Sequence, residues 1–114
     1  DQFNYGVTLV RMNRLADAET HIMAALKDDP NLPEAHDVLG GLLENRGRLD
    51  DALAEYREAV RIRPNFGKAH LDLGAALANR RDRAGAAEEF RKATADPNPE
   101  IQQQARQALQ SMLH

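Results

Sequence analysis

Residues 33–64 read PEAHDVLGGLLENRGRLDDALAEYREAVRIRP, and this stretch decides the fold because the segments before and after it are imperfect copies of it. A shift of 34 residues brings into register Gly6, Gly40 and Gly74. Two sets of alanines and a Pro-Asn pair return in a similar way: Ala18, Ala52 and Ala86; Ala25, Ala59 and Ala93; Pro30-Asn31, Pro64-Asn65 and Pro97-Asn98. A fixed period of about 20 to 50 residues indicates a stacked array of structural repeats.

Each copy carries two segments in which apolar residues recur at helical spacing. We expect helices at about residues 2–12, 15–27, 34–46, 50–62, 68–80 and 83–95. Each segment has one apolar stripe, so none of them can be buried alone. The chain has only three Phe, two Tyr and no Trp to fill a core, so the repeated Gly and Ala positions indicate close contacts between helices.

The turns between the two helices of each copy share one special position. Gly47 holds it in the central copy, where glycine suits a left-handed helix cap. Asn13 holds it in the first copy, and Asn tolerates a positive φ better than most residues. Arg81 replaces the glycine in the third copy, so we expect that turn to be strained or slightly different.

A last helix is predicted at residues 99–113, where the pattern changes. Asn98 is a suitable N-cap, and Pro99 is a suitable first helical residue. The apolar residues of this segment form one stripe: Ile101, Ala105, Ala108, Leu109 and Met112. Its other face is rich in Gln and Arg, so we expect the helix to cap the array, with one face on the last repeat and one in water.

The length of 114 residues fits one compact unit. We expect a single domain with repeats at 1–32, 33–66 and 67–97 and the capping helix at 98–114. The chain begins at Asp1 without Met, already inside a repeat, so we expect a truncated first repeat and a longer parent protein.

The composition excludes several classes of site. The net charge of -3 gives no basic field and argues against nucleic acid as a partner. No apolar run approaches the roughly 18 residues that a membrane helix needs, so membrane insertion is not predicted. Because there is no Cys, the chain has no disulfide, no thiolate zinc site and no cysteine nucleophile, and its compartment stays open.

The central copy resembles the tetratricopeptide repeat. The resemblance is carried by Leu39-Gly40, Leu43, Gly47, Ala52, Tyr56, Ala59 and Pro64. The third copy matches at Leu73-Gly74, Leu77, Ala86, Phe90 and Ala93, and the first at Gly6, Leu9, Ala18, Ile22, Ala25 and Pro30. The departures are Tyr5 for the usual Leu, His36 and His70 where a large aromatic residue is common, and Asn13 and Arg81 for the turn Gly.

The resemblance implies an all-α, right-handed α-solenoid of stacked antiparallel helix pairs, with about seven helices. In this family the first helix of each pair lines a concave groove, where a peptide or helix of a partner protein lies. Carried over to this chain, the groove is lined by Phe3, Val7, Val10, Arg11, Glu34, Asp37, Val38, Gly41, Glu44, Asn45, Lys68, Leu71, Asp72, Ala75, Ala78 and Asn79.

Two specialisations of the family are not predicted. Some members hold the C-terminal carboxylate of chaperones with a clamp of Lys, Asn and Arg, but the matching positions here hold Phe3, Val7, Val38 and Asp72, and only Lys68 agrees. A ladder of groove asparagines is missing too, since Val38 and Asp72 stand where Asn would recur.

The predicted groove is apolar in the first repeat, acidic in the second through Glu34, Asp37 and Glu44, and small and apolar in the third. Such a surface suits a partner segment with aliphatic anchors and one or two Lys or Arg. The alternative is that the three carboxylates are a solvated helix face. Phe3 and Val7 have an alternative of their own, as core that an upstream helix would cover.

Other candidate sites are weak. His36 and His70 hold equivalent positions, about 8 to 10 Å apart on neighbouring helices, so we interpret them as packed core rings rather than as zinc ligands. A cluster of Arg80, Arg81 and Arg83 lacks the aromatic residues that stack on bases. The sequence has no nucleophile beside a base and no phosphate-binding Gly loop, so neither an enzyme nor a cofactor is predicted.

The sequence therefore predicts a scaffold that binds a partner protein and performs no catalysis of its own. Two alternatives stay open. The array could be an accessory part of a larger enzyme or secretion component and position a protein substrate for it. It could instead assemble with itself through the truncated first repeat.

Overall fold

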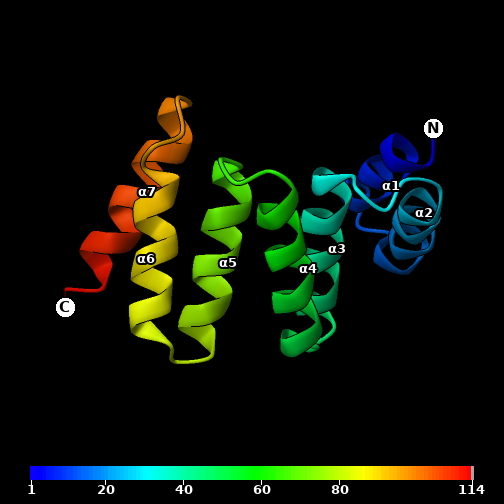
Figure 1. Ribbon diagram of the computed structural model, residues 1–114. Helices are drawn as coiled ribbons and strands as arrows, with labels where there is room; N and C mark the ends of the chain where they lie inside the picture. Colours follow the sequence, from blue (N-terminus) through cyan, green and yellow to red (C-terminus); the bar gives the residue numbers. More distant parts are fainter. Residues whose placement is uncertain (114) are drawn as a thin grey trace. The chain divides into compact units, whose positions relative to one another are not determined.

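The computed structural model describes residues 1–113, which fold into seven α-helices and no strand. The helices are α1 (Gln2–Arg11), α2 (Leu15–Asp28), α3 (Pro33–Asn45), α4 (Leu49–Ile62), α5 (Gly67–Asn79), α6 (Arg83–Ala93) and α7 (Pro99–Ser111) (Figure 1). Each begins and ends within two residues of its predicted bounds. The predicted all-α solenoid of helix pairs is confirmed.

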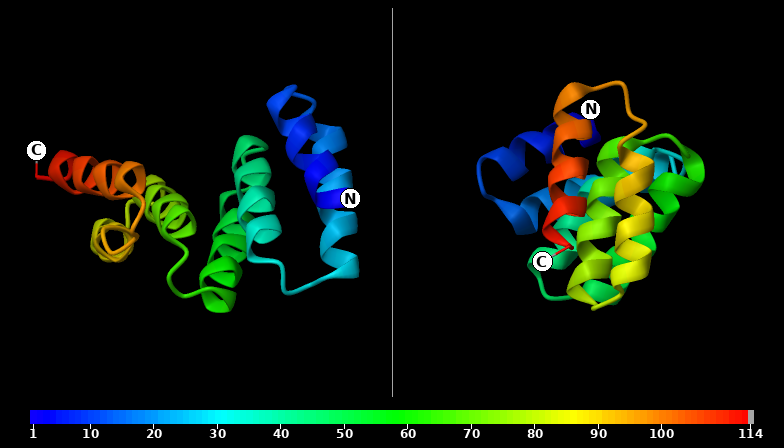
Figure 2. Two further views of the ribbon diagram at one scale, coloured as in Figure 1. Left: turned by 90° about the horizontal axis from the view of Figure 1, so that it is seen from above. Right: turned by 90° about the vertical axis from the view of Figure 1, so that its left-hand side faces the viewer.

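The helices fall into two compact units, Asp1–Ile62 and Arg63–His114. In the first unit α1 pairs with α2 and α3 with α4, and α2 packs against α3. In the second unit α5 pairs with α6, and α7 packs on both of them (Figure 2). Whether residues 1–114 form a single domain stays a prediction.

At each repeated glycine, a large side chain from the second helix of a pair packs against the backbone of the first helix. A Cβ at Gly6 would lie 2.6 Å from the Ile22 side chain, and a Cβ at Gly40 would lie 2.5 Å from the Tyr56 ring. Gly74 has the same relation to Phe90, at 2.6 Å. The repeated alanines are buried as well: Ala18, Ala25, Ala52, Ala59, Ala86 and Ala93. Small residues thus recur with the 34-residue period because the paired helices touch there.

The three turns within the pairs have one conformation. Asn13, Gly47 and Arg81 have φ angles of 60°, 76° and 66°. In the central turn the Gly47 N–H donates to the Glu44 carbonyl and the Arg48 N–H to the Leu43 carbonyl, both at 2.9 Å, and the same pattern recurs in the other two turns. This pattern of two bonds around a left-handed residue is the Schellman motif. The Arg81 turn therefore does not differ in conformation from the other two, and the strain expected there corresponds to the left-handed φ that arginine adopts.

The last helix has the predicted start and place. The Asn98 side chain accepts a hydrogen bond from the Glu100 N–H at 2.9 Å, and Pro99 begins the helix. Ala105 is fully buried, and α7 covers parts of α5 and α6. Its predicted role as the cap of the last repeat is consistent with this packing.

Candidate partner-binding surface

The predicted groove residues lie on the first helix of each pair and form two sets. The first-unit surface consists of Phe3, Val7, Val10 and Arg11 on α1 and Glu34, Asp37, Val38, Gly41, Glu44 and Asn45 on α3. The second-unit surface consists of Lys68, Leu71, Asp72, Ala75, Ala78 and Asn79 on α5. All of these residues except Asp37 keep part of their surface accessible.

The apolar part of the first-unit surface lies on α1. Phe3, Val7 and Val10 are half-buried, so each ring or side chain packs on the unit and still presents an apolar edge. Val38 on α3 is half-buried in the same way. These side chains offer apolar contacts to a partner.

The acidic part of this surface is smaller than predicted. Asp37 is only 3 % exposed, so its carboxylate adds little to the surface. Glu44 is half-buried and accepts a hydrogen bond from the Tyr56 hydroxyl at 2.6 Å. One feature of the sequence indicates this bond. Tyr56 stands where the other repeats have Ile22 and Phe90, and a buried hydroxyl needs a partner.

Gly41 is the exposed glycine of this surface, and packing does not explain it. A Cβ there would meet only the Tyr56 hydroxyl oxygen, at an ordinary contact distance of 3.8 Å. The neighbouring Gly40 differs, because a Cβ at Gly40 would overlap the Tyr56 ring. A glycine inside a helix costs stability relative to alanine, roughly 0.5 to 1 kcal/mol. A glycine without a packing role on an exposed face lets the backbone of another chain approach closely.

The second-unit surface is small and mostly exposed. Lys68 and Asp72 form an ion pair one helical turn apart, with 3.0 Å between Nζ and Oδ2. Leu71 is half-buried, and Ala75 and Ala78 are exposed. The surface therefore presents a narrow strip of short side chains beside one compensated ion pair.

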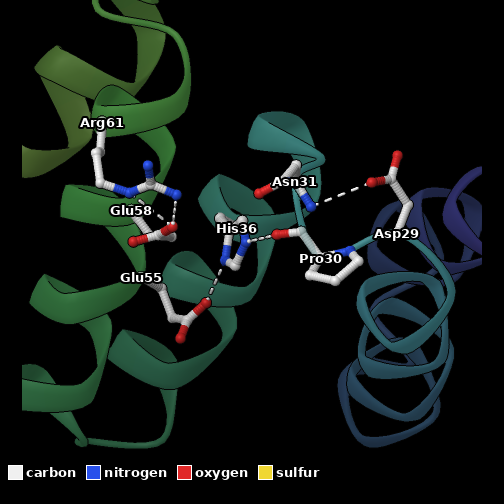
Figure 3. Close-up of polar contacts among 7 residues, drawn as sticks. All are labelled: Asp29, Pro30, Asn31, His36, Glu55, Glu58 and Arg61. Carbon is white, nitrogen blue, oxygen red and sulfur yellow. Dashed lines mark hydrogen bonds and ion pairs between the residues drawn. The ribbon is translucent and has the colours of Figure 1, made fainter.

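The histidines belong to a repeated polar link between paired helices. His36 Nε2 donates to the Pro30 carbonyl at 2.7 Å, and its Nδ1 lies 2.7 Å from the Glu55 carboxylate (Figure 3). His70 makes the equivalent contacts with Glu89 at 2.7 Å and with the Pro64 carbonyl at 2.6 Å. No group of three His, Cys, Asp or Glu within residues 1–113 is placed to hold a metal ion.

The first repeat has the same link with its partners exchanged. His21 Nδ1 lies 2.6 Å from the Gln2 Oε1 atom, and 19 residues separate these two residues as they do in the other repeats. The His21 ring also packs against Tyr5, with 4.5 Å between ring centroids. The link could not be predicted from the histidine positions alone, because the feature that the three repeats share is a polar pair 19 residues apart and not a histidine at one position.

Two ion pairs shift the pKa values of their members, the solvent-accessible pair Glu58–Arg61 and the pair of the buried Glu89 with the exposed Lys92. Arg61 donates to Glu58 and lowers the pKa of that carboxyl group below its usual value (Figure 3). The hydrogen bond to Glu89 raises the pKa of the Lys92 ammonium group. These shifts come from neighbours one turn apart on the same helix and do not indicate a catalytic group.

In the described part of the chain, no helix has the length and apolar character needed to cross a membrane.

Comparison with known proteins agrees with the repeat geometry. A family model described as tetratricopeptide repeat matches residues 6–66. The chain belongs to the tetratricopeptide repeat family. No match was found among curated proteins.

Tetratricopeptide repeat structures are also similar to this chain as a whole. The type III secretion translocator chaperone SycD of Yersinia enterocolitica matches with a TM-score of 0.89, 14% identity, and coverage of 98% of this chain and 81% of that chain. SycD in complex with a peptide of the translocator YopD matches with a TM-score of 0.87 and 14% identity, and the match covers 98% of this chain and 89% of that chain. The first tetratricopeptide repeat domain of Spaghetti (RPAP3), bound to the HSP90 peptide SRMEEVD, matches with a TM-score of 0.83 and 16% identity. The match covers 99% of this chain and 91% of that chain. At these identities the likeness establishes the fold.

Proposed function

We propose that this chain is a scaffold that binds a segment of a partner protein on the first-unit surface, with the second-unit surface as a further contact area. The observation that carries the proposal is Gly41, an exposed helical glycine that packing does not require, since a Cβ there would contact only the Tyr56 hydroxyl oxygen. The apolar edges of Val7, Val10 and Val38 lie on the same surface. Peptides bound to SycD and to the RPAP3 domain support the proposal, since these proteins have the same fold.

The bound segment is expected to be aliphatic with one basic residue. Aliphatic side chains would contact the apolar edges on α1, and the backbone would pass close to Gly41. Glu34 and Glu44 lie on the same helix as Gly41, so a Lys or Arg in the segment is favoured. Because the residues of the carboxylate clamp are not matched, the proposal does not include recognition of a C-terminal carboxylate. The proposal assigns no catalytic step to this chain.

Selection from a library of randomised peptides tests the proposal. We expect the protein to enrich aliphatic peptides with a basic residue, and the variant Gly41→Arg to bind them at least about tenfold more weakly. The variant Gly41→Ala separates blockage from helix propensity, because it stabilises the helix without adding bulk. Ala54→Arg is the matched control, since Ala54 is an exposed small residue on α4. Unchanged binding by Gly41→Arg, with its fold intact by circular dichroism, would contradict the proposal.

A further inference from the structure

A second candidate site lies in the second unit, in an open crevice of about 510 Å³ between α6 and α7. Figure 2 shows these two helices, in yellow and in orange to red. Ala87, Leu109 and Leu113 give the crevice an apolar lining, and Leu113 is 82% exposed. A large aliphatic side chain in water at this place leaves apolar area that a ligand can cover.

Comparison with the central repeat indicates why the crevice is open. Arg83 and Ala87 occupy the positions that Leu49 and Leu53 hold in the central repeat, 34 residues earlier. Leu53 is buried, with 5% of its surface exposed. In the third repeat a leucine side chain is reduced to the methyl group of Ala87. The space that this truncation leaves next to α7 remains open.

Three arginines line the crevice, and residues 1–113 provide no acidic partner for them. The Arg83 guanidinium donates to the Met112 carbonyl oxygen, and Arg91 and Arg106 are exposed. Within residues 1–113, none of the three guanidinium groups forms an ion pair with a carboxylate. The charge at the crevice is thus positive in a chain whose net charge is -3.

The crevice between α2 and α3 in the first unit serves as an internal comparison. It has a similar size, about 530 Å³, and its lining includes Leu15, Glu19 and Arg46. There the guanidinium group of Arg46 binds both carboxylate oxygens of Glu19, at 2.9 and 2.7 Å. Its positive charge is therefore compensated inside the crevice. The described residues that line the α6–α7 crevice include no such carboxylate, and this difference points to an anionic ligand from outside.

We propose that the α6–α7 crevice binds an acidic segment of a partner protein that carries aliphatic side chains at helical spacing. The aliphatic side chains cover Leu109 and Leu113 and fill the space above Ala87. Carboxylates of the segment pair with Arg91 and Arg106, and guanidinium groups suit such pairs because they can bind a carboxylate through two parallel hydrogen bonds. This site is separate from the first-unit surface and does not depend on its proposed function.

Two synthetic peptides of about 14 residues test the site by fluorescence anisotropy. Both are acetylated and amidated and have Leu at helical spacing (i, i+4, i+7), one with Glu at the remaining positions and the other with Lys. The Glu peptide is expected to bind, and the Lys peptide to bind at least about tenfold more weakly at low salt. Because the first-unit surface is proposed to favour basic segments, the two peptides are compared on the variant Gly41→Arg, in which that surface is blocked. Equal binding of the two peptides by this variant would overturn the proposal, because apolar contact alone would then explain the affinity.

Variants of the intact chain locate the binding. Ala87→Leu copies Leu53 of the central repeat, and by filling the crevice it is expected to abolish binding of the Glu peptide. The double variant Arg91→Glu, Arg106→Glu is expected to reverse the preference toward the Lys peptide. Arg57→Glu is the matched control, since Arg57 is the exposed equivalent of Arg91 in the central repeat.

Three results would contradict the assignment. The first is undiminished binding of the Glu peptide by Ala87→Leu, and the second is an equal loss of binding with Arg57→Glu. The third is concentration-dependent self-association, measured by light scattering, that Ala87→Leu abolishes, since a second copy of the chain would then be the ligand of the crevice. Circular dichroism and thermal melting establish that each variant is folded. Gly41→Arg is expected to bind the Glu peptide normally, which keeps this test separate from that of the first-unit surface.

Discussion

At the scale of single residues, two adjacent glycines of α3 have opposite meanings. Gly40 is required by packing, because the Tyr56 ring occupies the space where its Cβ would be. Gly41 is not required by packing, because a Cβ there would make only an ordinary contact of 3.8 Å with the Tyr56 hydroxyl oxygen. Only the repeat alignment distinguishes the two in the sequence, since Gly6 and Gly74 match Gly40, whereas Val7 and Ala75 match Gly41. A residue that the fold does not need is a better guide to function than one that every repeat shares.

The turn residue Arg81 carries a cost that can be removed. Its φ is 66°, and a residue with a Cβ adopts this backbone conformation at a cost of roughly 1 to 2 kcal/mol. Arg81→Gly is therefore expected to raise the free energy of unfolding by about 1 kcal/mol. The reverse exchange, Gly47→Arg, is expected to lower it by a similar amount. A Cβ at Gly47 would meet no atom within 4 Å, so the backbone conformation alone would be responsible. Urea denaturation measures both changes, and a destabilised Arg81→Gly variant would refute this account of the turn.

At the scale of helix pairs, the three repeats share an equivalent polar link between their two helices, and these links differ in burial. The side chains of His70 and Glu89 are 5% and 11% exposed, and those of His36 and Glu55 are 12% and 26% exposed. The Gln2–His21 link is the most exposed of the three. Because water competes more strongly at exposed sites, the contribution of the link to stability should follow its burial.

Alanine substitution in each link tests this order. His70→Ala leaves the buried Glu89 with Lys92 as an ion-pair partner at 3.1 Å, and is expected to lower the free energy of unfolding by about 3 kcal/mol. His36→Ala should cost less, and Gln2→Ala should cost about 0.5 kcal/mol or less. Chemical denaturation at constant pH measures the three values. Equal losses in the three variants would indicate that these links contribute through packing volume and not through buried charge.

At the scale of the whole molecule, the repeat pattern made the fold predictable. The matching Gly and Ala positions fix where the paired helices touch, and the shared turn position fixes where each pair reverses, so the helix bounds were predicted closely. The site was less predictable, because it depends on which way each side chain points. The burial of Asp37 and the bond from Tyr56 to Glu44 both follow from packing that a helix pattern does not encode. The α6–α7 crevice has one signal in the sequence, since Ala87 stands where the central repeat has Leu53.

The two compact units each have their own core, so damage to one core should remain largely local. Ile22 is fully buried in the first unit, and Phe90 is 6% exposed in the second. In repeat arrays most contacts join neighbouring elements, and opening of one region need not open the rest. Phe90→Ala is therefore expected to speed amide hydrogen exchange mainly in α5, α6 and α7, and Ile22→Ala mainly in α1 and α2.

Hydrogen exchange followed by mass spectrometry resolves these regions as separate peptides. Each substitution is expected to cost about 2 to 5 kcal/mol in the region that it opens. Ala54→Arg, on the exposed face of α4, should leave exchange unchanged throughout and serves as the control. If Phe90→Ala and Ile22→Ala instead accelerate exchange equally from α1 to α7, the chain unfolds as one cooperative unit. The single domain predicted from the sequence would then be the better description, because loss of one core would be transmitted through all of the repeats.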